Sequence, residues 1–110
     1  MANKVNFDDM KRVSPREGVN RRTFSGRNSM VVLNEIEPFA QPALHSHPHE
    51  QITTILQGEC DFILGEETIR MRKGDVILIP PNVRHTLRPV GGETILNLDV
   101  FSPVREEYLV

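Results

Sequence analysis

The chain has 110 residues, of which 25% are charged, and its formal net charge is −2. This length predicts one domain, and the mildly acidic balance favours neither a nucleic-acid partner nor an anionic membrane surface. The single cysteine, Cys60, excludes a disulfide within the chain, and its alternating surroundings indicate a packed thiol rather than a nucleophile. No apolar run approaches the ~18 residues of a membrane span and the first residues do not resemble a signal peptide, so we expect a cytoplasmic protein.

Short β-strands punctuated by glycine and proline account for most of the chain. Because no long helical period interrupts them, the pattern predicts an all-β sandwich or barrel. The continuous apolar run at 76–79 predicts a strand buried on both faces. The single domain 1–110 is expected to comprise a polar arm (1–19) with room for one short strand, a barrel (20–103) and a tail (104–110) with one helical turn. Strands are predicted near 21–24, 30–37, 51–57, 60–64, 68–72, 76–79, 83–89 and 94–101.

Three of the four histidines fall within five residues, at His45, His47 and His49. Imidazole is the commonest metal ligand in proteins, and a His-x-His pair on an extended segment points both rings to one side. The fourth, His85, follows a glycine–strand–proline segment that can return it to the same place. These residues predict a metal site, although a partly buried His85 that only hydrogen-bonds a loop is the alternative.

Gln51 is the expected fourth ligand, provided that the chain bends. A straight strand rises roughly 3.3 Å per residue and would hold positions 45 and 51 about 20 Å apart, whereas metal–nitrogen bonds measure ~2.1 Å. We therefore expect His45 and His47 to end one strand, a corner at Pro48, and Gln51 to open the next strand facing back.

Two neighbours in the same segment compete for that role. The corner leaves His49 without a place among the ligands, and we expect it at the rim of the site or supporting a ligand. Glu50 offers a carboxylate, but its parity is opposite to that of Gln51, so it is disfavoured.

These spacings resemble the two motifs of the cupin family. The first has the form His-x-His, three residues, an acidic or amide ligand, six residues, Gly; the second has the form Gly, five residues, Pro, four residues, His. Asn82 stands where the second motif commonly has Gly, and no Asn follows the last histidine at the usual place. The matching residues are His45, His47, Gln51 and Gly58 in the first motif, and Gly74, Pro80 and His85 in the second.

The resemblance implies a cupin jelly-roll β-barrel, or double-stranded β-helix, with one divalent ion in its mouth. The ion would be held by His45, His47, Gln51 and His85, and nickel, zinc, iron and manganese all remain open. Most cupins carry Glu where this chain has Gln51. Three imidazoles and an amide leave the ion its full charge, which favours Lewis-acid chemistry over the stabilisation of a more oxidised metal.

A closer resemblance adds the end of the chain. The stretch 45–51, His-Ser-His-Pro-His-Glu-Gln, and residues 98–109, Leu-Asp-Val-Phe-Ser-Pro-Val-Arg-Glu-Glu-Tyr-Leu, together resemble the small pectin-degradation cupins of the KdgF type. Such proteins open the ring of 4,5-unsaturated monouronates released from pectin or alginate, giving linear keto sugars. The resemblance implies that Asp99 and Arg105 are the catalytic residues of a metal-dependent isomerase.

The chemistry of the two residues agrees with that implication. Asn97, Asp99 and Phe101 share one face of the last strand, and an Asp beside a dication can act as a general acid or base. Arg105 has a guanidinium fork that donates two parallel hydrogen bonds to a carboxylate. An exposed strand Asp and a surface Arg are the alternatives.

Two other functions stay open at this point. One is a non-catalytic cupin that binds a metal and a sugar acid as a sensor or carrier, and the other is a cupin dioxygenase, which needs O₂. Because a barrel of this size gains buried surface by pairing, we also expect a homodimer, formed through sheet edges or exchanged N-terminal strands.

Overall fold

The computed structural model describes residues 2–109, so Met1 and Val110, the ends of the predicted domain, lie outside the described residues. Within this range the chain is built from β-strands, as the sequence predicts, and from two short 3₁₀ turns, of which only the one in the tail was expected. The elements are η1 (Phe7–Asp9), β1 (Val13–Arg16), β2 (Val19–Ser25), β3 (Met30–Ile36), β4 (Glu50–Gln57), β5 (Glu59–Leu64), β6 (Glu67–Arg72), β7 (Val76–Ile79), β8 (His85–Val90), β9 (Ile95–Ser102) and η2 (Glu106–Tyr108).

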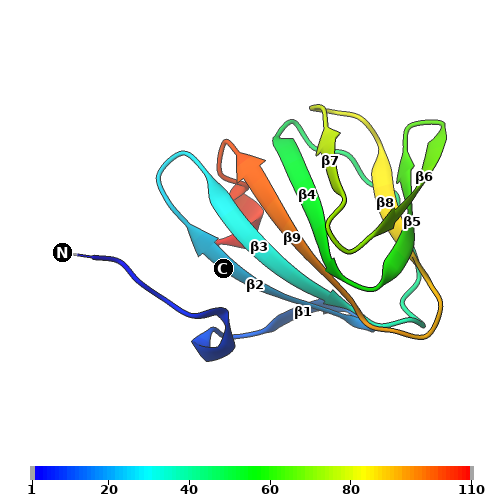
Figure 1. The fold of residues 1–110 in the computed structure, drawn as a ribbon. Helices are drawn as coiled ribbons and strands as arrows, with labels where there is room; N and C mark the ends of the chain where they lie inside the picture. The colour runs from blue at the N-terminus through cyan, green and yellow to red at the C-terminus, as the bar shows by residue number, and fades with distance from the viewer. Residues whose placement is uncertain (1, 110) are drawn as a thin grey trace.

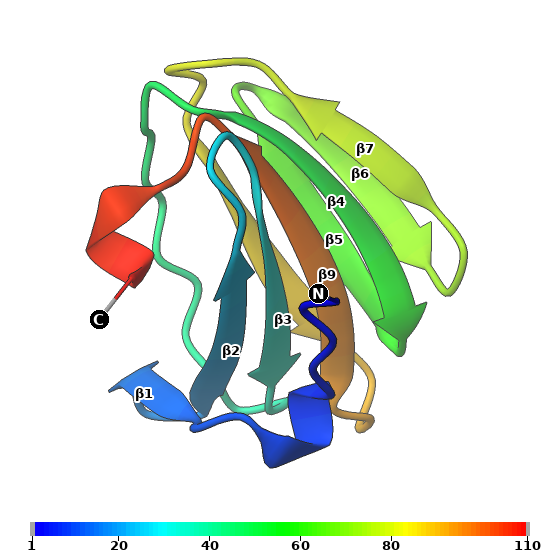
Figure 2. The same ribbon diagram turned by 90° about the vertical axis from the view of Figure 1, so that its left-hand side faces the viewer.

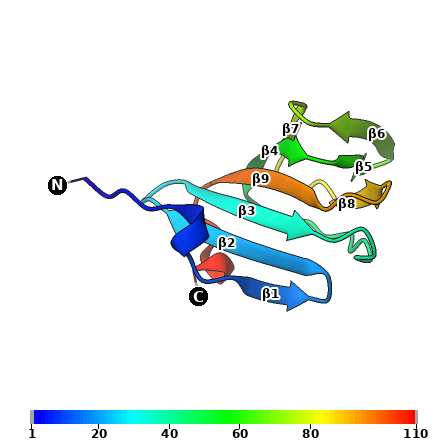
Figure 3. The same cartoon turned by 60° about the horizontal axis from the view of Figure 1, so that its bottom comes forward.

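The strands form two antiparallel sheets. The larger has the order β1-β2-β3-β9-β4-β7 and the smaller has the order β6-β5-β8. Figure 1 shows β3, β9 and β4 side by side, with β5, β6 and β8 in the second layer. Figure 3 shows β1 at the outer edge of the larger sheet and the N-terminal segment with η1 close to it. This all-β arrangement is the expected jelly roll. The division into arm, barrel and tail stays a prediction.

Alternation along each strand decides which side chains enter the space between the sheets. On β9, Ile95, Asn97, Asp99 and Phe101 are buried, while the residues between them face outward. The interior is apolar at one end, where β9 and β4 carry isoleucines, and is more polar further along both strands. A smaller apolar cluster of Met30, Val32 and Phe101 also lies in the interior. The apolar end comprises Val19, Ile36, Ala40, Ile55, Cys60, Phe62, Met71, Ile79, Leu87 and Ile95.

Cys60 is one of these interior residues and is fully buried. Burial is the largest influence on its thiol and raises the pKa to about 12. The thiol therefore stays protonated and inert, which agrees with a packed cysteine rather than a nucleophile.

The prediction that 76–79 is buried on both faces was wrong. Val76 is 64% exposed and Leu78 is 54% exposed. The reason is that β7 lies at the edge of the larger sheet, where only Ile79 is fully covered by the interior. A continuous apolar run thus marks an outward apolar surface here rather than a central strand.

The histidine segment is a bent connection and not the end of a strand. His45 makes only an isolated bridge with His85, and His47 lies in irregular chain, so the predicted strand ending at His47 was wrong. The predicted corner is present, because the chain bends at Pro48 and His49 before β4 begins at Glu50. Proline disfavours continued strand pairing, which explains the corner.

Two turns of the motifs need unusual backbone. Gly58 has φ +87°, and a Cβ added there would lie 2.5 Å from the Cδ1 atom of Ile95, so only glycine fits without displacing a core side chain. Asn82 has φ 67°, a left-handed conformation that asparagine tolerates and that glycine commonly supplies in the motif.

The C-terminal turn η2 lies beside β2 (Figure 2). The guanidinium of Arg21 on β2 lies over the ring of Tyr108 in this turn. No described helix is long and apolar enough to cross a membrane.

Candidate metal centre

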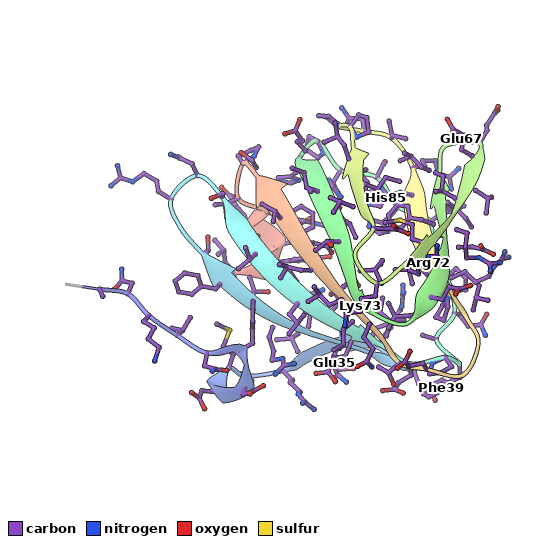
Figure 4. All side chains as sticks on the ribbon, in the orientation of Figure 1. Glu35, Phe39, Glu67, Arg72, Lys73 and His85 are labelled. Carbon is purple, nitrogen blue, oxygen red and sulfur yellow. The ribbon has the colours of Figure 1, made fainter. Side chains whose placement is uncertain are left out.

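Three histidines from two distant parts of the chain meet between the sheets. One nitrogen from each of His45, His47 and His85 lies within 4.8 Å of the other two. Figure 4 shows His85 among the strands, whereas the labelled Glu67 and Phe39 lie at the periphery. Ligand atoms on one ion with ~2.1 Å bonds can be up to about 4.2 Å apart, so these nitrogens need only a small movement to share one. The cluster can hold a metal ion.

Backbone hydrogen bonds align the two segments that carry the histidines. The His45 amide donates to the carbonyl of His85 (3.1 Å), and the His85 amide donates to the carbonyl of His45 (2.9 Å). The amide of Asn82 donates to the carbonyl of His47 (2.8 Å). The left-handed turn at Asn82 thus holds the second motif against the first, and the ring positions follow from this pairing.

Each imidazole of the cluster is oriented in the same way. The Nδ1 atom of His45 is 2.9 Å from the Ala43 carbonyl, that of His85 is 2.9 Å from the Val83 carbonyl, and that of His47 is 3.1 Å from the His49 carbonyl. A carbonyl only accepts, so each Nδ1 carries the proton and each Nε2 presents a lone pair to the centre. The buried Nε2 of His85 has no hydrogen-bond partner, as expected for an atom that ligates an ion.

Gln51 places an oxygen in the same space. Its Oε1 atom lies 3.0 Å from Nε2 of His47. Since Nδ1 of that histidine already carries the proton, two acceptors face one another, and an intervening cation resolves their repulsion. Two ligands at right angles on one ion with ~2.1 Å bonds are about 3.0 Å apart, so the donor set fits a divalent ion.

The two competing residues lie outside the three-histidine cluster. His49 supports the site with its backbone carbonyl, which accepts from His47, and its ring centroid is 5.4 Å from that of His47. Glu50 is exposed, whereas the adjacent Gln51 is buried. The opposite exposure of Glu50 and Gln51 agrees with the parity argument from the sequence, whereas His49 was set aside because of the corner.

The imidazoles are held neutral, the form that binds metals. Burial is the largest influence on His85 and, with the charges of His45, His47 and Arg105, lowers its pKa to about 4 against the opposing Val83 hydrogen bond. Burial likewise lowers the pKa values of His45 and His47, and the Arg105 charge adds to the effect.

Asp99 lies at the centre of a buried polar network. Its Oδ1 atom accepts from the Thr53 hydroxyl (2.7 Å) and the Asn97 amide (2.9 Å), and its Oδ2 accepts from the Asn34 amide (2.8 Å). Burial raises the pKa of Asp99, and donors from Thr53, Gln51, Asn34 and Asn97 oppose that rise. A raised pKa brings a carboxyl closer to the pH at which it can exchange protons.

Arg105 is held by aromatic rings rather than by a full ion pair. Its guanidinium carbon lies 4.2 Å from the ring centroid of Tyr108 and 5.4 Å from that of Phe101. Its side chain is 11% exposed, and Nε lies 3.4 Å from a Glu107 oxygen without a hydrogen bond. The guanidinium thus keeps unused donors close to the cluster.

Most of these groups line one pocket of about 300 Å³. Its lining includes two cluster histidines, the amide, the carboxylate and the guanidinium described above, together with two arginines near the front of the chain. The polar and charged side chains of the lining include His45, Gln51, His85, Asp99, Arg105, Arg21 and Tyr108. No role was predicted from the sequence for Thr53, Asn34 or Tyr108. For Thr53 and Asn34 a signal was available, because alternation along the predicted strands indicates which polar side chains point inward.

Two facing antiparallel sheets with a histidine cluster between them define a jelly-roll protein with a site for a metal ion. The cupin domain family matches residues 32–101, more than half of the chain, and the protein belongs to this family. No curated protein sequence matches significantly.

Solved structures of similar proteins agree with the fold. KdgF from Halomonas sp. is 25% identical, with a TM-score of 0.84 over 93% of this chain and 95% of that one. An RmlC-like cupin from Shewanella frigidimarina is 23% identical, with a TM-score of 0.87 over 99% of this chain and 97% of that one. A predicted oxalate decarboxylase from Thermotoga maritima is 19% identical, with a TM-score of 0.78 over 93% of this chain and all of the other (100%).

Proposed function

We propose that the protein is a metal-dependent enzyme that converts cyclic 4,5-unsaturated monouronates to their linear keto forms. The observation that carries the proposal is the shared pocket: Asp99 and Arg105 line the same cavity as His45 and His85. A binder of sugar acids needs a guanidinium near the ion, but it has no need of a buried carboxyl with a raised pKa. The likeness to KdgF supports the same reaction.

In this proposal His45, His47, Gln51 and His85 hold one divalent ion. When bound, the ion supplies Lewis-acid chemistry, stabilising negative charge that develops on a substrate oxygen. The four ligands are uncharged, since burial keeps the imidazoles neutral and Gln51 is an amide.

The reaction is an isomerisation, so no oxidant or reductant is needed. The C1 hydroxyl loses its proton, the bond from C1 to the ring oxygen breaks, and the electron pair passes to that oxygen as an enolate across C4 and C5. A proton then adds to C4 and the ring oxygen becomes the C5 ketone. Asp99 relays the proton, and Arg105 holds the carboxylate through its free donors.

The dimensions of the pocket suit a single sugar. About 300 Å³ is at the lower end of the range for small-molecule sites. The guanidinium groups of Arg21 and Arg105 give the lining a positive character, which favours an anionic sugar over a neutral one.

The direct test is incubation with an unsaturated monouronate while the conjugated ultraviolet absorbance is followed. We expect absorbance to fall with the wild type and to persist with chelator-treated protein. Uronates from pectin and from alginate serve as parallel substrates. If the sugar binds but its absorbance does not change, the sensor or carrier function replaces the enzyme; if turnover needs O₂, the dioxygenase replaces the isomerase.

Metal content is tested separately by elemental analysis. We expect about one divalent ion per chain in the wild type, whose identity the analysis also gives, and its loss in His47→Ala. A fully occupied His47→Ala protein would refute the ligand set.

We further propose that the protein acts as a homodimer in the cytoplasm. The exposed apolar side chains on β4 and β7, including Ile52 and Leu78, support pairing through the outer face of the larger sheet. Cell fractionation tests the location, and sedimentation tests the pairing.

A further inference from the structure

A chain of buried hydrogen bonds connects the proposed acid–base residue to the proposed fourth metal ligand. The Gln51 amide nitrogen donates to the Thr53 hydroxyl oxygen at 2.9 Å, and that hydroxyl donates to Asp99 Oδ1 at 2.7 Å. Thr53 is completely buried, while Gln51 is 5% and Asp99 is 7% exposed. Bulk water therefore does not compete for these groups, and each must be satisfied within the chain.

The direction of this series of hydrogen bonds is set at Asp99. Asn34 and Asn97 both aim amide nitrogens at this carboxyl, so its oxygens serve as acceptors. A hydroxyl has one hydrogen to donate. Because the Thr53 hydrogen goes to Asp99, the Thr53 oxygen is left to accept, and only the nitrogen end of the Gln51 amide can satisfy it.

This direction decides which end of the Gln51 amide faces the histidines. With its nitrogen on Thr53, the amide presents Oε1 to Nε2 of His47. The reversed amide would place an NH₂ group against that imidazole nitrogen, donate a hydrogen bond to it, and fill the space of the ion. An amide is symmetric enough in shape to adopt either orientation, so a neighbour must choose between them.

We infer that Thr53 is a positioning residue that locks the Gln51 amide with its oxygen towards the histidine cluster. This inference rests on the metal site of the proposed function and adds a residue that touches neither the ion nor the substrate. Residues that orient metal ligands commonly change metal affinity 10–100-fold when they are replaced.

The test measures the affinity for Zn²⁺ by competition with a chromophoric chelator, in the absence of any sugar. Thr53→Val removes the hydroxyl and keeps the shape, and we expect it to weaken Zn²⁺ binding about 10–100-fold. Thr53→Ser restores the hydroxyl and is expected to bind as the wild type does. The matched control is Thr94→Val. The Thr94 hydroxyl also donates to a carboxylate, that of Glu37, but Thr94 lies just before β9, at the end of the strand away from the site.

Repeating the substitution in a Gln51→Glu protein separates the effect of Thr53 on the orientation of the residue 51 side chain from its effect on packing. A glutamate at position 51 presents an oxygen whichever way it turns, so in Gln51→Glu protein the further change Thr53→Val is expected to cost little Zn²⁺ affinity. An equal loss in both backgrounds would overturn the inference, as would wild-type affinity in Thr53→Val alone. If the wild type itself fails to bind Zn²⁺, the metal site of the proposed function fails instead.

A measurement on the unsubstituted protein covers the case in which Thr53→Val does not fold. In the zinc-loaded wild type, nuclear magnetic resonance should find the Gln51 side-chain amide protons protected from solvent exchange relative to those of the exposed Gln41. Equally fast exchange of the two amides would overturn the inference.

Discussion

His85 is the histidine whose ionisation the fold changes most. Burial, the nearby histidines and Arg105 lower its pKa from 6.5 to about 4. In the metal-free protein, the unfolded chain therefore binds a proton between these values that the folded chain rejects. The stability associated with neutral His85 is fully present above pH 6.5 and is lost as the pH falls towards 4.

We predict that acidifying the chelator-treated protein from about pH 7 to about pH 5 lowers its free energy of unfolding by about 2 kcal/mol through His85 alone. Urea unfolding at the two pH values measures the loss. His85→Gln removes the titrating group, so its unfolding free energy should depend less on pH by this amount. Identical pH dependence in both proteins would contradict the prediction.

Asp99 gives the second prediction at this scale. Because general acid–base groups typically contribute ~10²–10⁴-fold, we expect Asp99→Asn to lower kcat on an unsaturated monouronate by about that factor. Asparagine keeps an oxygen that can accept from Thr53, so metal content and fold should survive. Near-wild-type turnover in this variant would place the proton relay on another residue.

The kinetics of an Arg105 variant can distinguish a role of this residue in substrate binding from a role in catalysis. Arg105→Ala should mainly raise KM if the guanidinium only binds the carboxylate, and should also lower kcat if it orients the transition state. Steady-state kinetics with saturating metal separates the two, and unchanged kcat and KM would refute any role for this arginine.

The rise of a strand and the length of a metal bond demand a corner at Pro48, and the structure has this corner, with Gln51 3.0 Å from His47. His85 was expected to join them through its glycine–strand–proline segment, and it lies in the same cluster. The partners of Asp99 on other strands could not be found in this way. Thr53 comes from a different strand, and its pairing with Asp99 depends on a register that no local pattern encodes.

At the scale of elements, β7 shows the limit of an apolar run as a signal. Val76–Ile79 has the composition of a strand covered on both faces, but its place in the sheet leaves the outer side chains exposed. Composition identifies a strand, whereas only the strand order determines how many of its faces are covered.

The C-terminal turn η2 supports the site through Tyr108. The guanidinium carbons of Arg21 and Arg105 lie 3.9 and 4.2 Å from the centre of its ring. Two such groups cannot share one face, so the ring separates them and holds Arg105 over the pocket.

We predict that Tyr108→Leu raises KM for the uronate by about 2- to 30-fold, since cation–π contacts contribute roughly 0.5–2 kcal/mol. Tyr108→Phe keeps both ring faces and should retain wild-type KM. Steady-state kinetics on the two variants decides the point: an equal effect in both would assign the role to the hydroxyl and contradict the ring as the support.

At the scale of the whole molecule, the two sides of the larger sheet have opposite character around the site. The inward-facing side chains of β4 and β9 near the site form the polar network. Most of their outward-facing side chains are apolar. Ile52 lies opposite Val100 of β9 on one side and Leu78 of β7 on the other, which makes a continuous apolar row across three strands. Ile52 is 42% exposed and Leu78 is 54% exposed. A contiguous apolar patch of this kind on a small domain indicates an interface.

We therefore predict that the wild type sediments as a dimer at micromolar concentration and that Leu78→Glu sediments as a monomer. In a twofold dimer the substituted residue occurs once in each copy, so two charges enter the same apolar interface without partners. Leu44→Glu is the matched control, because Leu44 is 48% exposed but lies outside the strands. Metal content should be unchanged in Leu78→Glu, since β7 carries none of the proposed ligands. A dimeric Leu78→Glu protein would move the interface to the N-terminal strands, and a monomeric wild type would remove it altogether.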